Sequence, residues 1–543
     1  MSTFGVLLRQ RLRRDRWQLI IWIACIGLLA AFSVASIANT YGNEKSREDV
    51  LRLAIANPAI LVLRGLPNGA SAGQFTFFEI FTFLALLAGL MSTFLAVRHT
   101  RAEEESGRAE LVASTRAARI TPTVATIVHG VIANVLVALI VGLGFISAGL
   151  PVSGSFVAGA ATGGAGIAFL AVGLMTSQLM STSRGANGLA AAIVVLAYFL
   201  RGIGDAIGSI SPDGLHMTSG WPTWLTPIGW GEQTAAYGAD VWWPLLLDLG
   251  FAALLVVGVF AFQAQRDTGA SLIAERSGRA DARSTLSGPL GLAWRLQWPT
   301  VLGWAAGGAA TGFLAGALGS IVSSSFANDP SLAAIRHGLE SIGSGGSGAL
   351  SKVFISAIFA LVGVLAAACA TQVIVRLRQE EAGGTAELML ATPLSRIRWL
   401  LEFLLVGVVA VVTVLLAAGL ASGLSAVAAG ESSSLFGDSL TAAAAQLPVS
   451  FVYLGVLALV FVVLPNWTIV IAWATLGLGA FIGVFGGFIG LPDWIHNLSP
   501  FTHTPVVTGP SPDWTGGIWM FAIALVATVV ASALIRRRDF AIA

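Results

Sequence analysis

The sequence predicts an all-α membrane protein with about twelve transmembrane helices, and both its composition and its glycine content support this fold class. Of the 543 residues, 56% are hydrophobic and only 11% are charged, and the mean hydropathy is +0.82. Soluble globular proteins carry about 25% charged residues, so a soluble multidomain enzyme is excluded. The 63 glycines agree with a membrane fold, because small residues allow helices to pack closely in lipid.

Apolar runs long enough to span a bilayer occur along the whole chain. A spanning helix needs about 20 apolar residues. The runs lie near residues 17–39, 76–97, 123–149, 155–179, 187–204, 242–264, 299–322, 352–375, 399–424, 445–465, 467–489 and 515–535. Before the first run, Phe4, Leu7, Leu8 and Leu12 share one helical face and the arginines occupy the other. This pattern predicts an amphipathic helix at the inner membrane surface, with a plain basic tail as the alternative.

The distribution of basic residues predicts the orientation of the chain. If the N-terminus is cytoplasmic, 23 of the 30 Lys and Arg residues lie in cytoplasmic segments and 7 lie outside. The carboxylates divide the other way, with 13 inside and 15 outside. Because a basic excess marks the cytoplasmic side of short loops, we expect a multi-pass protein of the cell membrane with both termini in the cytoplasm.

Two segments of the chain match each other in one register. R-A-E-E-E-S-G-R-A-E-L-V-A-S-T begins at Arg101, and R-Q-E-E-A-G-G-T-A-E-L-M-L-A-T begins at Arg378, an offset of 277 residues. The match predicts two similar six-helix units of the same orientation, which is the pattern of a parallel repeat. We assign the units to residues 1–265 and 291–543, with a cytoplasmic linker at residues 266–290.

The sequence carries no sign of catalytic chemistry. Its two lysines, Lys45 and Lys352, do not follow a glycine, so a G-x-x-x-x-G-K-[ST] phosphate loop is missing and the chain is not expected to hydrolyse nucleotide by itself. The six histidines show no metal-ligand spacing beyond a loose pair on the outer side, and no nucleophile elbow is present. We therefore predict no catalytic residue, no metal, no cofactor bound by this chain and no nucleic-acid partner.

The two matched acidic segments are the most informative feature. Each places a carboxylate pair before a glycine and then continues with A-E-L, so a short amphipathic turn follows a glycine hinge. Such a duplicated helix on the inner side suggests two docking points for a cytoplasmic partner whose arginines accept the carboxylates. An ordinary solvated loop is the alternative.

A few charged and aromatic residues lie within the apolar runs. Arg201 and Asp205 are four residues apart on one helix face, which predicts a structural ion pair. Glu79 and Asp248 are lone acids near the outer ends of their runs; each could bind a cationic drug or a proton, or reach interfacial water. The phenylalanines around Glu79 could form an aromatic wall for a large apolar substrate, or they could face lipid. Phe77 and Phe78 are the main candidates of this wall.

The motif E-E-x-x-G-x-x-E-L resembles the coupling-helix loop of type-2 ABC exporter permeases. The segments at 198–205, 224–233, 266–273 and 396–400 are similar to actinobacterial permeases described as polyketide-antibiotic exporters. The resemblance implies two fused six-helix units that work with two copies of a separate ATPase subunit, which uses ATP and Mg. It implies as coupling residues Glu103, Glu104, Gly107, Glu110, Glu380, Glu381, Gly384 and Glu387. Arg108 and Arg116 stand where the second segment has Thr385 and Pro393, so the two docking points could be unequal.

The leading hypothesis is therefore the membrane-spanning permease subunit of an ATP-driven exporter. Its substrates would be hydrophobic or amphiphilic compounds such as antibiotics, drugs or lipids. The alternative is a proton-coupled drug antiporter, which commonly also has twelve helices in two halves. Antiporters of that kind are expected to carry a short basic turn after the second helix, whereas the segment here is long and acidic.

Overall fold

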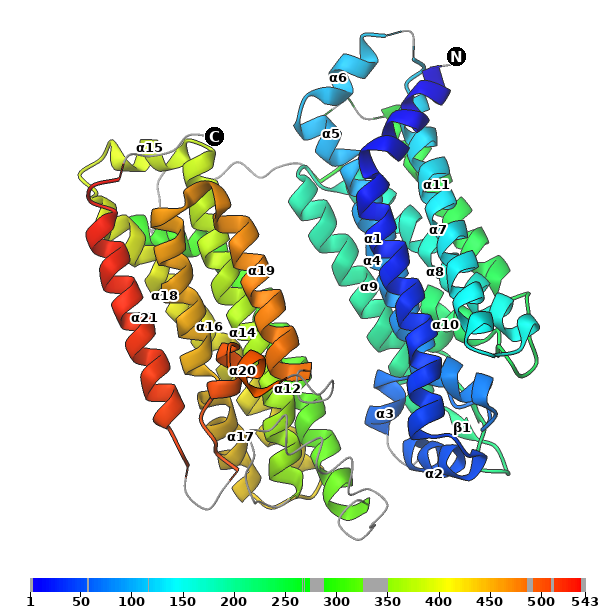
Figure 1. Ribbon diagram of the computed structural model, residues 1–543. Helices are drawn as coiled ribbons and strands as arrows, with labels where there is room; N and C mark the ends of the chain where they lie inside the picture. Colours follow the sequence, from blue (N-terminus) through cyan, green and yellow to red (C-terminus); the bar gives the residue numbers. More distant parts are fainter. Residues whose placement is uncertain are drawn as a thin grey trace. The chain divides into compact units, whose positions relative to one another are not determined.

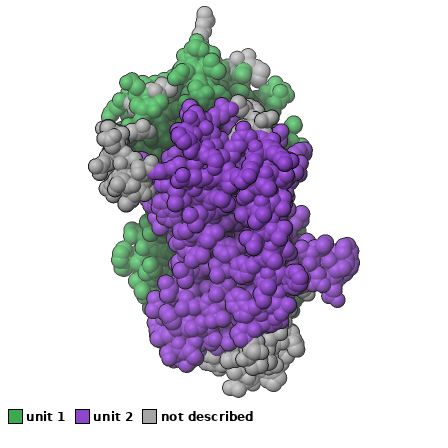
Figure 2. All heavy atoms as spheres, turned by 90° about the vertical axis from the view of Figure 1, so that its left-hand side faces the viewer, with its two compact units in different colours: residues 1–278 green, residues 279–543 purple. Residues whose placement is uncertain are grey.

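The computed structural model describes residues 3–55, 58–115, 117–265, 267, 269–273, 288–325, 350–485, 492–508 and 512–538 (Figure 1). Twelve helices in these residues are long and apolar enough to cross a membrane, as the sequence predicts. The chain divides into two compact units, residues 1–278 and 279–543, which are coloured separately in Figure 2. The division falls within the predicted linker, most of which lies outside the described residues.

Unit 1 is a bundle of six long helices. They are α1 (Thr3–Thr40), α4 (Ala72–Arg98), α7 (Thr121–Ser147), α8 (Val152–Leu179), α9 (Ser183–Ala206) and α11 (Leu245–Gln265). Helix α8 is the most buried of them, and it packs against α4, α7 and α11. Its glycines allow this close approach: a Cβ on Gly159 would lie 2.3 Å from the carbonyl oxygen of Ala138 on α7.

Short elements close both ends of the bundle of unit 1. The end opposite the N-terminus carries α2 (Glu44–Ile55), α3 (Pro58–Leu63), β1 (Ser209–Ile210), β2 (Met217–Thr218), η1 (Thr223–Leu225) and α10 (Pro227–Glu232) (Figure 1). Strands β1 and β2 pair antiparallel, with Ser209 opposite Thr218. The end that carries the N-terminus holds two short helices, α5 (Arg101–Glu105) and α6 (Arg108–Ala113).

The N-terminal residues correct one prediction. They form a single helix with the first span, α1, and not every charged residue faces away from the bundle. Arg11 is 4% exposed and Asp15 is 2% exposed. Arg11 donates to the carbonyl oxygen of Pro122 at 2.6 Å and to the hydroxyl of Thr126 at 2.5 Å. The other arginines of this stretch are exposed, so the prediction that the arginines occupy the polar face is wrong for Arg11 alone, which finds polar partners on a neighbouring helix. The place of this stretch at the membrane surface stays a prediction.

Unit 2 is built from α12 (Pro289–Ser325), α14 (Leu350–Ala382), α16 (Arg396–Ala428), α17 (Ser434–Ala444), α18 (Leu447–Val463), α19 (Thr468–Ala480) and α21 (Thr515–Leu534), with the shorter α15 (Thr385–Leu390), η4 (Pro465–Trp467), η5 (Phe481–Phe485), α20 (Asp493–His496) and η6 (Pro500–His503). Helices α12 and α16 pack closely along glycines spaced four residues apart. A Cβ on Gly312 would lie 2.1 Å from the carbonyl oxygen of Ala418, and one on Gly316 would lie 2.0 Å from that of Ser422. This spacing places one small-residue stripe against the partner helix, as is common in membrane bundles.

Candidate functional site

The two segments that match in sequence have the same local conformation. In unit 1, α6 begins after Gly107, whose φ is 71°, and in unit 2, α15 begins after Gly384, whose φ is 73°. Apart from the chain neighbours, no atom of the described residues lies within 4 Å of a Cβ built on either glycine. The requirement for glycine is therefore conformational, because only glycine adopts the left-handed region without a steric penalty.

Both segments lie at the end of their unit that is rich in arginine. In unit 1 this arginine-rich end holds the N-terminus, and in unit 2 it holds the C-terminal end of α21 (Figure 1). Arg101 anchors the start of α5 to the bundle, since it donates to the carbonyl oxygens of Ser177 at 2.7 Å and Ala270 at 3.0 Å. In unit 2, Arg378 donates to the side chain of Asn466 at 3.0 Å.

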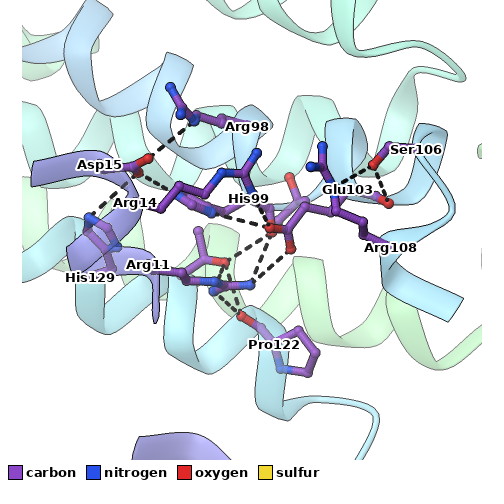
Figure 3. Close-up of polar contacts among 12 residues, drawn as sticks. Arg11, Arg14, Asp15, Arg98, His99, Glu103, Ser106, Arg108, Pro122 and His129 are labelled. Atoms are coloured by element: carbon purple, nitrogen blue, oxygen red, sulfur yellow. Dashed lines mark hydrogen bonds and ion pairs between the residues drawn. The ribbon is translucent and has the colours of Figure 1, made fainter. Parts of the chain in front are cut away.

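The first acids of the segment in unit 1 face inward and already pair with cations of the same unit. Glu103 lies 3.5 Å from Arg11 and 3.1 Å from Arg14, both on α1 (Figure 3). Glu104 pairs with Arg101 at 2.8 Å, one turn earlier in the chain. Glu103 therefore ties α5 to α1, whereas the pair of Glu104 and Arg101 lies within α5.

The matched acids in unit 2 behave in the same way. Glu380 pairs with Arg376 at 2.5 Å, and Glu381 pairs with Arg378 at 3.2 Å. Glu381 also pairs with Arg538, just beyond the end of α21. Contrary to the expectation that all the duplicated carboxylates await a partner's arginines, four of them form ion pairs within their own unit.

Each short helix exposes an acid and the leucine that follows it. Glu110 and Glu387 are exposed, and the leucine that follows each is among the most exposed large apolar side chains of the described residues. Leu111 is 70% exposed and Leu388 is 75% exposed, and they too are 277 residues apart. Sequence reasoning missed these leucines, although the L of the repeated A-E-L was a visible signal.

Helix α6 covers a cavity of about 350 Å³ within unit 1. Ala109, Val112 and Ala113 of α6 line one side of it. Both polar and apolar residues line the rest, among them Arg11, Gln263 and Leu7. This cavity separates part of α6 from the bundle. The position of α6 is therefore held by the chain at its two ends and by the ion pairs of the neighbouring α5.

A group of residues next to Glu103 was also missed by sequence reasoning. Asp15 on α1 bonds to His99 at the end of α4, and Arg98 lies 3.2 Å from the same carboxylate. His129 on α7 points toward Asp15, with 3.9 Å between its Nε2 and the carboxylate oxygen (Figure 3). The spacing of the histidines in the sequence gave no sign of this grouping, because its members come from three helices.

At the opposite end of unit 1, the predicted partners Arg201 and Asp205 lie 3.0 Å apart and are fully buried. Glu232 on α10 joins them, 3.3 Å from Arg201. Burial raises the pKa of Glu232 well above its usual value, the charge of Asp205 raises it further, and Arg201 acts in the opposite direction. One guanidinium thus faces two carboxylates. The sequence predicted the pair of Arg201 and Asp205 but not the third member of this group, Glu232.

The predicted substrate-pathway residues lie in different environments. Glu79 is not a lone acid, since it pairs with Arg64. Asp248 is fully buried, and neither of its carboxylate oxygens has a hydrogen-bond partner among the described residues. Phe77 and Phe78 are buried in unit 1 and line a cavity of about 110 Å³ beside Glu232, so these rings do not face lipid.

Comparison with known proteins supports a transport function. Residues 286–536 match the family described as the C-terminal domain of the multidrug efflux system permease Rv1217c. The whole chain is similar to the multidrug efflux system permease protein Rv1217c of Mycobacterium tuberculosis (strain ATCC 25618 / H37Rv). The two are 33% identical over 540 residues, which cover 99% of this chain and 95% of that protein. The chain is therefore a multi-pass membrane protein that belongs to the multidrug efflux permease family.

Proposed function

We propose that this chain is the membrane-spanning subunit of an ATP-driven exporter in the cell membrane. Two copies of a separate ATPase subunit, which uses ATP and Mg, bind at the arginine-rich ends of the two units. These ends and both chain termini are cytoplasmic. The exported substrates are hydrophobic or amphiphilic compounds such as antibiotics, drugs or lipids.

The observation that carries this proposal is the duplicated pair of an exposed acid and an exposed leucine. Leu111 and Leu388 each stand on a short helix that an αL glycine sets off from the preceding helix. Burying such a leucine in a groove of a partner stabilises the complex by about 1.5–3 kcal/mol. The neighbouring Glu110 and Glu387 can accept hydrogen bonds from arginines at the rim of that groove.

The inward-facing acids give the docked helices a mechanical connection to the spans. In unit 1, Glu103 joins the segment to α1 through Arg11 and Arg14. In unit 2, Thr385 of α15 donates to the carbonyl oxygen of Glu380 on α14, and the next residue, Glu381, pairs with Arg538 beyond the end of α21. A displacement of α6 or α15 by an ATPase subunit is thereby transmitted to spanning helices of the same unit.

The docking assignment is tested with the double variant Leu111→Ser, Leu388→Ser. We expect the variant to reach the membrane in normal amount but to lose copurification of the ATPase subunit and drug-stimulated ATP hydrolysis. The matched control is Leu272→Ser, which changes a leucine that is 40% exposed in the segment bonded to Arg101 but outside both short helices. Undiminished copurification in the double variant would refute the docking assignment.

Energy coupling is tested separately, because a proton-coupled antiporter is the competing function. The chain is reconstituted with its ATPase subunit in vesicles, and uptake of a fluorescent hydrophobic drug is followed with ATP present. We expect uptake to continue after an uncoupler collapses the proton gradient. Loss of uptake while ATP hydrolysis continues would favour the antiporter.

A further inference from the structure

Two imidazoles and a carboxylate meet where α1, α4 and α7 converge in unit 1 (Figure 3). Asp15, His99 and His129 are all buried, and one ligand atom from each lies within 4.8 Å of the other two. We propose that this cluster binds one divalent transition-metal ion of the Zn²⁺ class, which links the three helices. The proposal does not depend on the proposed function.

His129 is a buried imidazole without a partner in the described part of the chain. Its side chain is fully buried, yet neither ring nitrogen has a hydrogen-bond partner among the described residues. An imidazole always carries at least one N–H, and leaving a buried polar group unpaired costs about 1–3 kcal/mol. A metal ion bound at Nε2 would take up the lone pair of that nitrogen, and the N–H of the ring would then lie at Nδ1.

The spacing around His129 suits an ion between the side chains. The 3.9 Å from His129 Nε2 to Asp15 Oδ2 is too long for a hydrogen bond. Zinc lies about 2.0–2.2 Å from nitrogen and oxygen ligands, so two ligand atoms of a tetrahedral site are about 3.3 Å apart. Closing this gap needs a movement of about half an ångström, while His99 and Asp15 must separate to admit the ion.

The second nitrogen of His99 lies near a carboxylate. Glu103 Oε1 is 3.5 Å from His99 Nδ1, too far apart for the hydrogen bond that a small shift of either side chain would form. Ligating histidines commonly donate this other N–H to a carboxylate, which fixes the tautomer and orients the ring. Nε2 of His99 then remains the nitrogen that faces Asp15 and the ion.

The neighbouring arginines leave room for a dication. Three arginines lie near the cluster, namely Arg11, Arg14 and Arg98, and Asp15 and Glu103 offset two of their charges. Arg11 is buried, but its guanidinium pairs with Glu103 and donates to the carbonyl oxygens of His99 and Pro122. Arg14 and Arg98 have side chains that are 32% and 37% exposed, so water and salt screen their charges. Two imidazoles and one carboxylate favour Zn²⁺ over Mg²⁺ or Ca²⁺, which prefer sites made of oxygen ligands alone.

The positions of unit 2 that correspond to the two histidines carry other residues. At the offset of 277 residues, Arg376 replaces His99 and Val406 replaces His129. Arg376 pairs with Glu380 at 2.5 Å, so a permanent cation holds the acid that corresponds to Glu103. A metal ion would therefore act on the short helices of unit 1 alone.

The test uses the purified full-length chain, stripped of metal and titrated with Zn²⁺ against a chromophoric chelator. We expect the unmodified chain to bind one Zn²⁺. His129→Gln and Asp15→Asn should each lower the affinity at least about tenfold, because even the loss of a group that only bonds to a ligand lowers metal affinity that much. The matched control is His216→Gln, which removes an exposed histidine paired with Asp213 at 2.5 Å and should leave the affinity unchanged.

A measurement on the unmodified chain keeps the proposal falsifiable if those variants fail to fold. Co²⁺ in a site of four or five ligands gives intense visible bands, and Zn²⁺ should abolish them. X-ray absorption of the zinc form should show nitrogen and oxygen ligands without sulfur. Weak bands like those of aqueous Co²⁺, or equal Zn²⁺ affinity in folded His129→Gln, would overturn the assignment.

Discussion

Replacing Arg201 with methionine should strongly destabilise unit 1. Arg201 is fully buried and lies 3.0 Å from Asp205 and 3.3 Å from Glu232. It also donates to the carbonyl oxygens of Leu61 at 3.2 Å and Val62 at 2.8 Å, both in the last turn of α3. Methionine retains an apolar chain but removes both the positive charge and every donor.

The expected cost follows from the groups left behind. Removing one partner of a buried ion pair typically costs about 3–5 kcal/mol, because the other charge stays buried without compensation. Two carboxylates face Arg201, so we expect the loss to reach the upper part of this range. Adding Asp205→Asn and Glu232→Gln to Arg201→Met should recover part of the loss, since no uncompensated charge then remains. The control Arg184→Met, at an exposed position of the same helix, should change stability by less than about 0.5 kcal/mol.

The pH dependence of the same variants tests the electrostatic reasoning. The pKa of Glu232 is raised by burial and by Asp205. Its contribution to stability is therefore complete below its usual pKa of 4.5 and is lost as the pH rises through the raised value. Free energies of unfolding are measured in lipid bicelles at pH 5 and pH 8. We expect Arg201→Met to lower the free energy of unfolding less at pH 5 than at pH 8. An equal decrease at the two pH values, or a decrease below about 1 kcal/mol, would refute the argument.

Three further predictions concern the short helices and a buried acid. Gly384→Ala should lower the free energy of unfolding by about 1–2 kcal/mol, because alanine is strained at the positive φ of this position. The control Gly437→Ala lies in a helix with open space at the Cβ and should be neutral or stabilising in thermal unfolding. Equal effects of the two changes would contradict this. Asp248→Leu should leave the melting temperature unchanged or raise it, because the buried carboxylate has no hydrogen-bond partner among the described residues; a marked fall would reveal one. The double variant Glu110→Arg, Glu387→Arg should express normally but lose drug-stimulated ATP hydrolysis, and full hydrolysis would count against docking through these acids.

The sequence by itself determined the spans and the local form of the short helices. Lipid offers backbone groups no hydrogen-bond partners, so long apolar runs must become helices, and all twelve predicted runs correspond to helical spans among the described residues. Gly107 and Gly384 likewise predict the turns before α6 and α15. Both have φ near 70°, and glycine adopts this conformation without help from distant parts of the chain. The exposed leucines that follow were within reach of the same local reasoning.

Only the tertiary structure decided which charges meet. Arg64 pairs with Glu79, although the sequence shows the acid alone in an apolar run. Glu232 reaches Arg201 across 31 residues, and Asp15 meets His99 across 84. Helical periodicity predicts partners three or four residues apart, as for Arg201 and Asp205. Whether two charges on different helices meet depends on which helix faces pack together and on how far the helices are shifted along their axes. The fit of side chains along the whole contact between the helices fixes both.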